Sequence, residues 1–326
     1  MTWSTSKVLV TGAGGFIGSH LVARLMELGA ETTAFCRYTS SGKPGLLDLL
    51  PREGRPEIIF GDLRDADAIR GAVQGKDVVF HLGALIAIPY SYVHPREFVE
   101  SNVIGTLNVL TAARESEAKV VHTSTSEVYG TAQTVPIDET HPLVGQSPYS
   151  ASKIGADKLA ESFFLSFGLP VATVRPFNTY GPGQSARAFI PSCITQALVR
   201  REIHMGHAEP TRDLTYVTDT VEGFIKAVEC DRVWGQTVNL GTGTEISMGD
   251  LARKIAALLG GDVPIVIDEE RKRPDPSEVW RLVSDNRRAR ELTGWEPRVS
   301  LDEGLARTVE WIQAHLDRYD PWRYER

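Results

Sequence analysis

Short runs of apolar and β-branched residues alternate with longer amphipathic segments from the N-terminus to about residue 125. The runs have the length and composition of buried strands, and they lie at Lys7–Val10, Thr32–Phe35, Glu57–Phe60, Asp77–Leu82 and Lys119–Ser124. Between them, apolar residues recur at helical spacing, which predicts helices over Phe16–Leu28, Ala66–Val73 and Phe98–Arg114. Strands and helices that alternate in this way are typical of parallel strands joined by right-handed crossovers. We therefore predict an α/β fold built on a doubly wound parallel sheet.

The second half of the chain has a mixed pattern. Ser147-Pro148 supplies an N-cap and a first-turn proline for a helix to about Phe167, and Pro170–Arg175 follows as one more strand. Further elements are predicted near Ala186–Arg200, Asp219–Glu229 and Thr237–Leu240, with capping boxes at Ser247/Asp250 and Ser300/Glu303. We predict that residues 1–180 form the sheet domain, which takes back parts of 215–242. Residues 181–326 are predicted to form a smaller α/β lobe packed against it.

Composition narrows the class of protein. The 326 residues carry 42 Asp+Glu against 35 Lys+Arg, a net charge of −7, and 42% of residues are hydrophobic. This acidic balance disfavours a general nucleic-acid binder, because binding to the phosphate backbone needs clustered Lys and Arg. The three cysteines, Cys36, Cys193 and Cys230, show no disulfide or metal-ligand spacing, and no apolar run approaches the length that crosses a bilayer. We expect a cytoplasmic protein with no metal, no membrane contact and no nucleic-acid partner.

Glycine recurs every third residue between the first predicted strand and the first predicted helix, at Gly12, Gly15 and Gly18. Glycines at this place allow a tight turn and a close backbone approach to a pyrophosphate. The start of the helix, at Phe16 and Ile17, then offers free N–H groups to the negative charge. The pattern predicts a Rossmann-type domain that binds a nicotinamide dinucleotide.

The end of the second predicted strand bears on the choice between NAD and NADP. NAD enzymes usually place Asp or Glu there for the ribose hydroxyls, whereas this chain has Cys36 followed by Arg37. A guanidinium suits a 2′-phosphate, which favours NADP; a solvated loop residue is the alternative reading of Arg37. Asp62 and Leu63 follow the third strand and are well placed to meet the adenine.

Candidate catalytic residues gather at two places. Thr125, Ser126 and Glu127 follow the strand at Lys119–Ser124, at the carboxyl edge where open α/β sheets bind ligands. Tyr149 and Lys153 are four residues apart on one predicted helix, so they share a face. A lysine ammonium beside a phenol and a cationic nicotinamide lowers the pKa of the phenol and makes it usable as a base.

These segments resemble the extended short-chain dehydrogenases/reductases of the nucleotide-sugar epimerase/dehydratase class over essentially the whole chain. The matching pieces are Thr11–Gly18, His81–Ala84, Ser124–Gly130, Tyr149–Lys153, Arg175–Pro182, Arg212-Asp213 and Asn239–Gly241. Within that class, Ala84–Tyr92, His122–Gly130, Gln146–Asp157 and Arg273–Glu278 look most like the NDP-N-acetylglucosamine 4,6-dehydratases of the legionaminic-acid pathway. The resemblance also implies that Leu82 lines the cofactor site.

The resemblance implies a mechanism. Tyr149 takes the O4 proton of the sugar while C4 gives a hydride to the nicotinamide, with Thr125 hydrogen-bonded to O4. Glu127 removes the C5 proton of the 4-ketone, the C6 hydroxyl leaves as water, and the hydride returns to C6. The product is a 4-keto-6-deoxy sugar nucleotide, and the tightly bound NAD(P) is recycled.

Position 126 departs from the dTDP-glucose dehydratases, which usually have Asp where this chain has Ser126. The GDP-mannose dehydratases resemble this chain there, so Glu127 is a candidate for both the base and the acid, and Ser126 remains an alternative for the acid. Simple 4-epimerases generally lack a carboxylate at position 127. UDP-glucuronate 4-epimerases and decarboxylases share Ser-Glu, and they remain the alternative function.

The resemblance places the nucleotide-sugar site in the second half. Asn178 and Arg212 match family positions that contact the diphosphate, and Arg187 and Arg273 are further donors, because guanidinium groups pair well with phosphates. His204 and His207 have no companion ligands and are not predicted to bind metal. The helices Phe98–Arg114 and Pro148–Phe167 are expected to form a four-helix homodimer interface, as is common in this family; burial within the monomer is the alternative.

Overall fold

Seven parallel strands form one central sheet in the computed structural model, which describes residues 2–51, 55–261, 263–272 and 274–320. The strand order is β11-β6-β5-β4-β1-β2-β3. The strands are β1 (Lys7–Thr11), β2 (Glu31–Arg37), β3 (Glu57–Gly61), β4 (Val78–His81), β5 (Lys119–Thr123), β6 (Val171–Pro176) and β11 (Thr237–Leu240). The sheet is doubly wound and parallel, as predicted from the sequence, and each predicted strand is confirmed within a few residues of its bounds.

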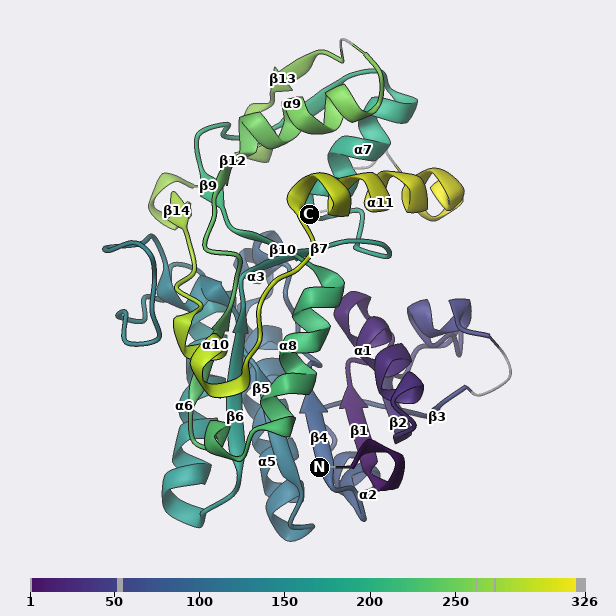
Figure 1. The fold of residues 1–326 in the computed structure, drawn as a ribbon, viewed down its shortest axis with the longest axis vertical. Coiled ribbons are helices and arrows are strands. Elements are labelled where there is room, and N and C mark those ends of the chain that lie inside the picture. The colour runs from purple at the N-terminus through teal and green to yellow at the C-terminus, as the bar shows by residue number, and fades with distance from the viewer. Residues whose placement is uncertain (1, 52–54, 262, 273, 321–326) are drawn as a thin grey trace.

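Helices cover both faces of the sheet (Figure 1). The contacts place α1 (Phe16–Glu27) beside α8 (Val217–Glu229), and they place α5 (Gly105–Glu115) between α2 (Ala66–Val73) and α6 (Pro148–Phe167). Two apolar clusters result, one containing Leu21, Val22 and Phe224, the other Ile69, Leu110 and Phe163. Strands buried on both faces explain the nearly continuous apolar runs of the sequence.

A smaller lobe lies above the carboxyl edge of the sheet in Figure 1. It contains α7 (Phe189–Val199), α9 (Met248–Leu258) and α11 (Leu301–Ala314). Its short strands are β8 (Ile203–Met205) with β13 (Ile265–Ile267), and β9 (Thr211–Arg212) with β12 (Ile246–Ser247) and β14 (Arg281–Leu282). Strands β7 (Asn178–Tyr180) and β10 (Leu214–Tyr216) pair between the sheet and this lobe, and α10 (Arg287–Thr293) packs against β11. The caps at Ser247 and Ser300 form as predicted, each side chain accepting the N–H three residues on.

The helix predicted over Phe98–Arg114 is confirmed, but its first turns are π-helical, which the sequence pattern did not predict. The structure has α3 (Ile88–Val93), α4 (Pro95–Phe98), a π-helical segment at Val99–Ile104, and then α5. The buried Asn102 of the π-helical segment accepts a hydrogen bond from Leu85 N and donates to Leu85 O and to Ser152 Oγ. These tertiary bonds, which periodicity does not encode, accompany the widened turn.

Candidate functional site

The chain reverses its direction along the sheet between β1 and β4, and this switch point forms one end of the site. Strand β1 pairs with β4 on one side and β2 on the other, and open α/β sheets bind ligands at such a point. His81 closes β4 with both ring nitrogens bonded, Nδ1 to Thr11 Oγ1 at 2.8 Å and Nε2 to Thr106 Oγ1 at 3.0 Å. Thr11 Oγ1 also accepts the N–H of Gly83 at 3.1 Å, which ties the two strand ends together.

The glycine turn fits a dinucleotide phosphate. Gly12 has φ +68°, and a Cβ on it would lie 2.8 Å from Gly83 Cα, so that only glycine allows these strand ends to approach. A Cβ on Gly18 would overlap the carbonyl oxygen of Gly12. Gly15 caps α1 without a side-chain hydrogen bond, so the first N–H groups of the helix, including those of Phe16 and Ile17, remain available to an anion.

The residues predicted for the adenosine end lie near one another. Arg37 is exposed at the end of β2, and its charge reaches Asp62 after β3. The hydrogen bond from Arg64, with Nη2 2.6 Å from Asp62 Oδ2, holds the pKa of Asp62 below its usual range. Leu63 lies close to the backbones of Gly83 and Gly105, because a Cβ on either glycine would come within 2.9 Å of it.

Leu82 directly follows β4 and is half-buried against the main core, beside this adenosine end. The structure therefore places Leu82 at the carboxyl end of β4, and Arg37, Asp62 and Leu63 at the carboxyl ends of β2 and β3, with β1 between the two groups.

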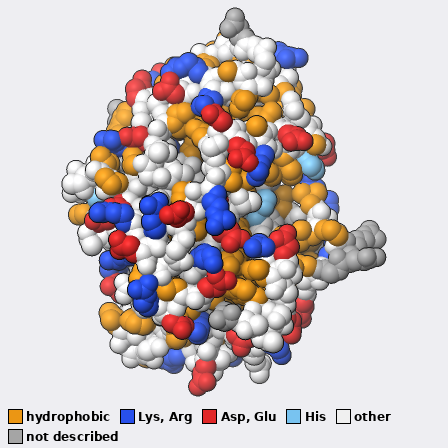
Figure 2. Space-filling view, in the orientation of Figure 1, with side chains coloured by type: hydrophobic (Ala, Val, Ile, Leu, Met, Phe, Trp, Pro, Cys, Tyr) orange, Lys and Arg blue, Asp and Glu red, His pale blue; other side chains and the backbone are white. Residues whose placement is uncertain are grey.

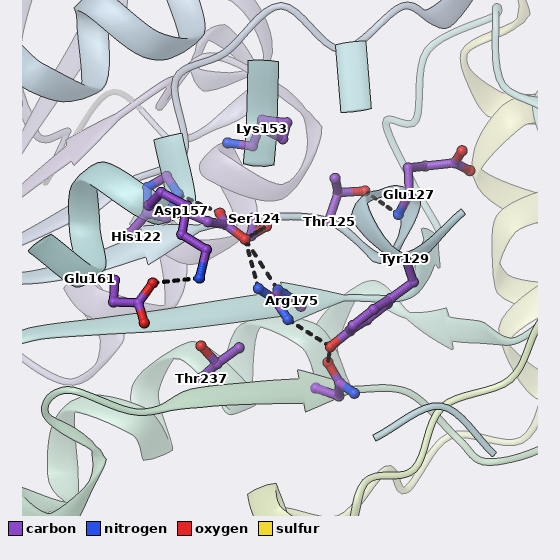
Figure 3. A network of polar contacts seen from close by, with 12 residues as sticks. His122, Ser124, Thr125, Glu127, Tyr129, Lys153, Asp157, Glu161, Arg175 and Thr237 are labelled. Carbon is purple, nitrogen blue, oxygen red and sulfur yellow. Dashed lines mark hydrogen bonds and ion pairs between the residues drawn. The ribbon is translucent and has the colours of Figure 1, made fainter. Parts of the chain in front are cut away.

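The candidate catalytic residues of the β5 end lie in a tight turn. Thr125 caps the 3₁₀ turn Ser126–Tyr129, and its Oγ1 accepts the N–H of Glu127 at 3.2 Å. Ser126 is buried, while Glu127 is half-buried. In Figure 3, Thr125 and Glu127 follow one another along this turn. The backbone of Glu127 therefore lies beside Thr125, which is predicted to hydrogen-bond the sugar O4, and in Figure 3 the Glu127 carboxylate points away from Thr125.

Helix α6 brings Tyr149 and Lys153 to this turn. Ser147 and Ser150 form a reciprocal capping box at its start, with Pro148 in the first turn. Tyr149 is 6% exposed and lies against the side chain of Thr125, and Lys153 is 4% exposed with Nζ donating to Thr123 O at 2.6 Å. The structure thus brings together the two groups of catalytic candidates that lie more than twenty residues apart in sequence.

Burial dominates the ionisation of both groups. It raises the pKa of Tyr149 well above its ordinary value, and the hydrogen bond with Thr125 only partly offsets it. It lowers the pKa of Lys153 to about 8, against the opposing charge of Asp157. In the chain alone the phenol therefore stays protonated, and a further positive charge beside it is needed to make it a base near neutral pH.

A buried polar network lies under Lys153, and the sequence analysis did not single out its residues as functional (Figure 3). Asp157 accepts hydrogen bonds from His122 Nε2 at 3.0 Å, Ser124 Oγ at 2.7 Å and Arg175 Nη2 at 3.0 Å. Arg175 Nη1 also donates to Tyr129 Oη at 2.9 Å, and Tyr129 donates to Asn239 Oδ1 at 2.7 Å. A signal was present in the sequence, since Asp157 follows Lys153 by four residues and so shares its face of α6.

The predicted substrate residues divide between two positions. Asn178 of β7 is half-buried, and its Oδ1 accepts no hydrogen bond from the described residues. Arg212 of β9 is 6% exposed and donates to Val279 O at 2.7 Å and to Glu278 Oε1 at 3.3 Å. Arg187 is exposed before α7, where its charge reaches Tyr90 of α3. Arg273 lies outside the described residues.

Other features of the molecule carry less information about chemistry. A cavity of about 270 Å³ lies beside Arg212, but Thr125, Tyr149 and Lys153 are not among its lining residues. On the face shown in Figure 2, acidic and basic side chains alternate. In the described part of the chain, no helix is long and apolar enough to cross a membrane, and no group of three or more His, Cys, Asp or Glu residues can hold a metal ion.

Comparison with known proteins shows which family this chain resembles. The family model described as GDP-mannose 4,6 dehydratase matches residues 9–308. The chain is 36% identical to the UDP-glucose 4-epimerase of Mycolicibacterium smegmatis, over 94% of this chain and 98% of that protein. It is also 36% identical to the dTDP-glucose 4,6-dehydratase of Streptomyces griseus, over 97% of each.

A solved structure extends the comparison to the fold. The chain matches TunA, described as an NAD-dependent NDP-hexosamine 5,6-dehydratase involved in tunicamycin biosynthesis. The TM-score is 0.85 at 29% identity, and the match covers 95% of this chain and 98% of TunA. Fold and sequence therefore point to the same group of proteins.

Proposed function

The chain belongs to the GDP-mannose 4,6 dehydratase family of nucleotide-sugar short-chain dehydrogenases/reductases, and we propose that it is an NDP-sugar 4,6-dehydratase. One observation carries the proposal. Lys153 donates to Thr123 O and Tyr149 lies against Thr125, so the Tyr149/Lys153 pair lies at the strand end that also carries Glu127. Oxidation at C4 and proton removal at C5 require both sets of groups around one sugar ring.

NAD(P) is the proposed cofactor, held at Gly12, Gly15 and Gly18 and at the start of α1, with Tyr149 and Lys153 at its nicotinamide end. A nicotinamide dinucleotide held there would supply the hydride acceptor for C4 and, once reduced, the hydride donor for C6, and would be regenerated in each turnover. The exposed guanidinium of Arg37 at the end of β2 favours NADP, whereas TunA is described as NAD-dependent. Denaturing the purified protein and weighing the released cofactor decides between them: NADP is expected, and NAD would refute the role of Arg37.

The chain's own residues perform the proton chemistry. Tyr149 accepts the O4 proton while Thr125 holds O4 by a hydrogen bond, and the positive charge of Lys153 stabilises the phenolate. Glu127 then takes the C5 proton, which the adjacent 4-ketone acidifies. Protonation of the departing C6 hydroxyl comes from Glu127 or from Ser126. Glu127 is the better candidate for this acid, because a serine hydroxyl is a very weak acid and Ser126 is buried.

N-acetylglucosamine nucleotides are the proposed substrates. The segments Ala84–Tyr92 and His122–Gly130 carry this expectation, and the match to a hexosamine dehydratase supports it. Asn178, Arg187 and Arg212 are proposed to bind the diphosphate, with Arg273 beyond the described residues. Arg212 is held by Glu278 in the structure, so diphosphate binding would replace an existing ion pair with another.

The proposed organisation assigns the dinucleotide to residues 1–180 with parts of 215–242, and the nucleotide sugar to residues 181–326. We further propose a homodimer through the α5–α6 face. The free cysteines Cys36, Cys193 and Cys230 fit the proposed cytoplasmic location.

A mass-spectrometric panel tests the reaction. Purified protein is incubated with UDP-, GDP-, dTDP- and CDP-sugars, including N-acetylglucosamine and glucuronate forms, without added cofactor. We expect one substrate to lose the mass of one water. If no sugar loses water but one changes otherwise, the dehydratase proposal is refuted.

A UDP-glucuronate 4-epimerase or decarboxylase is the second candidate. It is favoured by Ser126-Glu127 and by the equal identity to an epimerase and to a dehydratase. It predicts loss of carbon dioxide from UDP-glucuronate, or a new chromatographic peak at unchanged mass.

A further inference from the structure

Three side chains of α6, spaced one turn apart, hold four consecutive residues at the end of β5. Asp157 is hydrogen-bonded to His122 and Ser124, Lys153 donates to the carbonyl of Thr123, and Tyr149 lies against the side chain of Thr125. Tyr149, Lys153 and Asp157 follow one another at positions i, i+4 and i+8, so they form one row along the helix. The third member of this row has no role in the proposed mechanism.

We infer that Asp157 is a positioning residue for the Tyr149/Lys153 pair: its carboxylate fixes the β5 end against α6 and supplies the negative charge that balances Lys153 in the protein interior. The inference rests on the proposed function, because it takes this pair as the group that removes the O4 proton.

The geometry of Asp157 is that of a permanently charged group. It is 4% exposed, and its oxygens lie within hydrogen-bond distance of Nε2 of His122, Oγ of Ser124, and Nε and Nη2 of Arg175. Burial alone would raise the pKa of Asp157, but the hydrogen bond from His122 and the charge of Arg175 outweigh it and lower the pKa to about 2. The carboxylate therefore stays ionised at every pH at which the enzyme works.

Asp157 also helps to fix the position of Thr125 through its hydrogen bond with Ser124. Ser124 directly precedes Thr125, and its hydroxyl donates to Asp157 at 2.7 Å, the shortest of the hydrogen bonds to this carboxylate. The backbone that carries Thr125 to Tyr149 is thus anchored one residue earlier. Loss of the carboxylate loosens this anchor and removes a charge at the same time, and the two effects are separable by experiment.

The charged and titratable groups around this row come from every element that packs on α6. They are His81 of β4, His122 of β5, Arg175 of β6, Glu127 and Tyr129 of the 3₁₀ turn, Tyr90 of α3, Glu97 of α4, Glu100 of the π-helical segment and, at the far end, Arg114 of α5 against Phe167. Among the described residues, Asp157 is the carboxylate that is hydrogen-bonded to Arg175 and that lies on the same face of α6 as Lys153.

The sign of the electrostatic effect follows from this arrangement. A negative charge favours the protonated form of neighbouring groups, and Asp157 raises the pKa of both Tyr149 and Lys153. Replacing Asp157 by Asn lowers both pKa values. Replacing Arg175 by Gln leaves the Asp157 charge less compensated and shifts both in the opposite direction.

The experiment is an ultraviolet titration of tyrosinate in the protein loaded with its oxidised dinucleotide, with the Tyr149→Phe titration subtracted to isolate Tyr149. We expect the midpoint in Asp157→Asn to fall by about one pH unit, and the midpoint in Arg175→Gln to rise. Ser124→Ala is the matched control: it removes a hydrogen bond from the network without changing charge, so its midpoint should not fall as that of Asp157→Asn does.

The outcomes separate the inference from the proposed function. If the subtracted signal is present but neither Asp157→Asn nor Arg175→Gln moves its midpoint, Asp157 is merely structural and the inference is overturned while the proposed function stands. If Tyr149→Phe removes no tyrosinate signal below the ordinary tyrosine range, Tyr149 is not the base and both fail. Because the midpoint is expected to fall in Asp157→Asn and to rise in Arg175→Gln, either variant alone still tests the inference when the other folds poorly.

Discussion

Glu127 is the residue that separates elimination from simple epimerisation. It is half-buried at the β5 end, and its N–H donates to Thr125. We expect Glu127→Gln to bind the nucleotide sugar with unchanged affinity and to lose about 10³-fold in water elimination, because general acid–base groups contribute on this order. Calorimetry and product mass spectrometry measure the two quantities separately.

Glu161→Gln is the matched control for this prediction. Glu161 lies on the exposed side of α6, paired with Lys158 at 2.6 Å, and its replacement should leave both quantities unchanged. Undiminished turnover in Glu127→Gln would contradict the role of Glu127 in the proposed mechanism.

Asp157 also links stability to pH. Its folded-state pKa of about 2 lies below the ordinary value of 3.8, so the carboxylate contributes stability that is present above about pH 4. That contribution is lost as the pH falls from 4 toward 2, and it amounts to about 2 kcal/mol. Urea unfolding should therefore show a gap between the unchanged protein and Asp157→Asn that narrows over this interval; a constant gap would show that ionisation is not involved.

The turn between β1 and α1 leaves no room for a side chain larger than that of glycine at position 18. A Cβ on Gly18 would overlap the carbonyl oxygen of Gly12, which belongs to the backbone and cannot move aside cheaply. We expect Gly18→Ala to abolish retention of the dinucleotide through purification and to lower the melting temperature. Absorbance of the released cofactor and a thermal melt measure these effects.

Gly71 gives the contrasting control. It lies in the last turn of α2, exposed, with nothing within 4 Å of an added Cβ. Gly71→Ala should leave the cofactor in place and stabilise the protein by about 0.5–1 kcal/mol, because alanine loses less backbone entropy in a helix. Equal cofactor loss in both variants would refute the role of the glycine turn.

Local patterns predicted the elements whose determinants are local. Apolar runs gave all seven strands of the sheet, and Ser147-Pro148 correctly marked the start of α6. The π-helical turn at Val99–Ile104 was missed, because it depends on Asn102 reaching the backbone of Leu85 from a distant part of the chain.

The candidate site shows the same limit. The positions of Thr125, Glu127, Tyr149 and Lys153 came from motifs, and the structure brings them together. The hydrogen-bond partners of Asp157 lie on β5 and β6, far from α6 in sequence. The position of Asp157 in a helix therefore did not predict its ion pair with Arg175.

At the scale of the whole molecule, exposed apolar side chains on α6 and the π-helical segment support the proposed dimer. Val99, Ile104, Leu165 and Phe167 are 49%, 42%, 73% and 53% exposed. We expect a particle of twice 35.8 kDa by light scattering, and dissociation in Ile104→Arg, because a buried unpaired charge is costly at an interface.

Leu258→Arg is the control for the dimer. Leu258 lies on α9 of the smaller lobe with 43% exposure, close to that of Ile104, so a general effect of surface arginine would appear in both variants. Monomers in the unchanged protein, or dissociation in both variants, would contradict the proposed interface.

The path of the C4 hydrogen tests the central claim most directly. The substrate identified by the panel is prepared with deuterium at C4 and converted without added cofactor, and the product is analysed by mass and NMR. A 4,6-dehydratase must yield a product that has lost one water and carries the deuterium at C6. Deuterium retained at C4 with no loss of water would contradict the account and point to an epimerase.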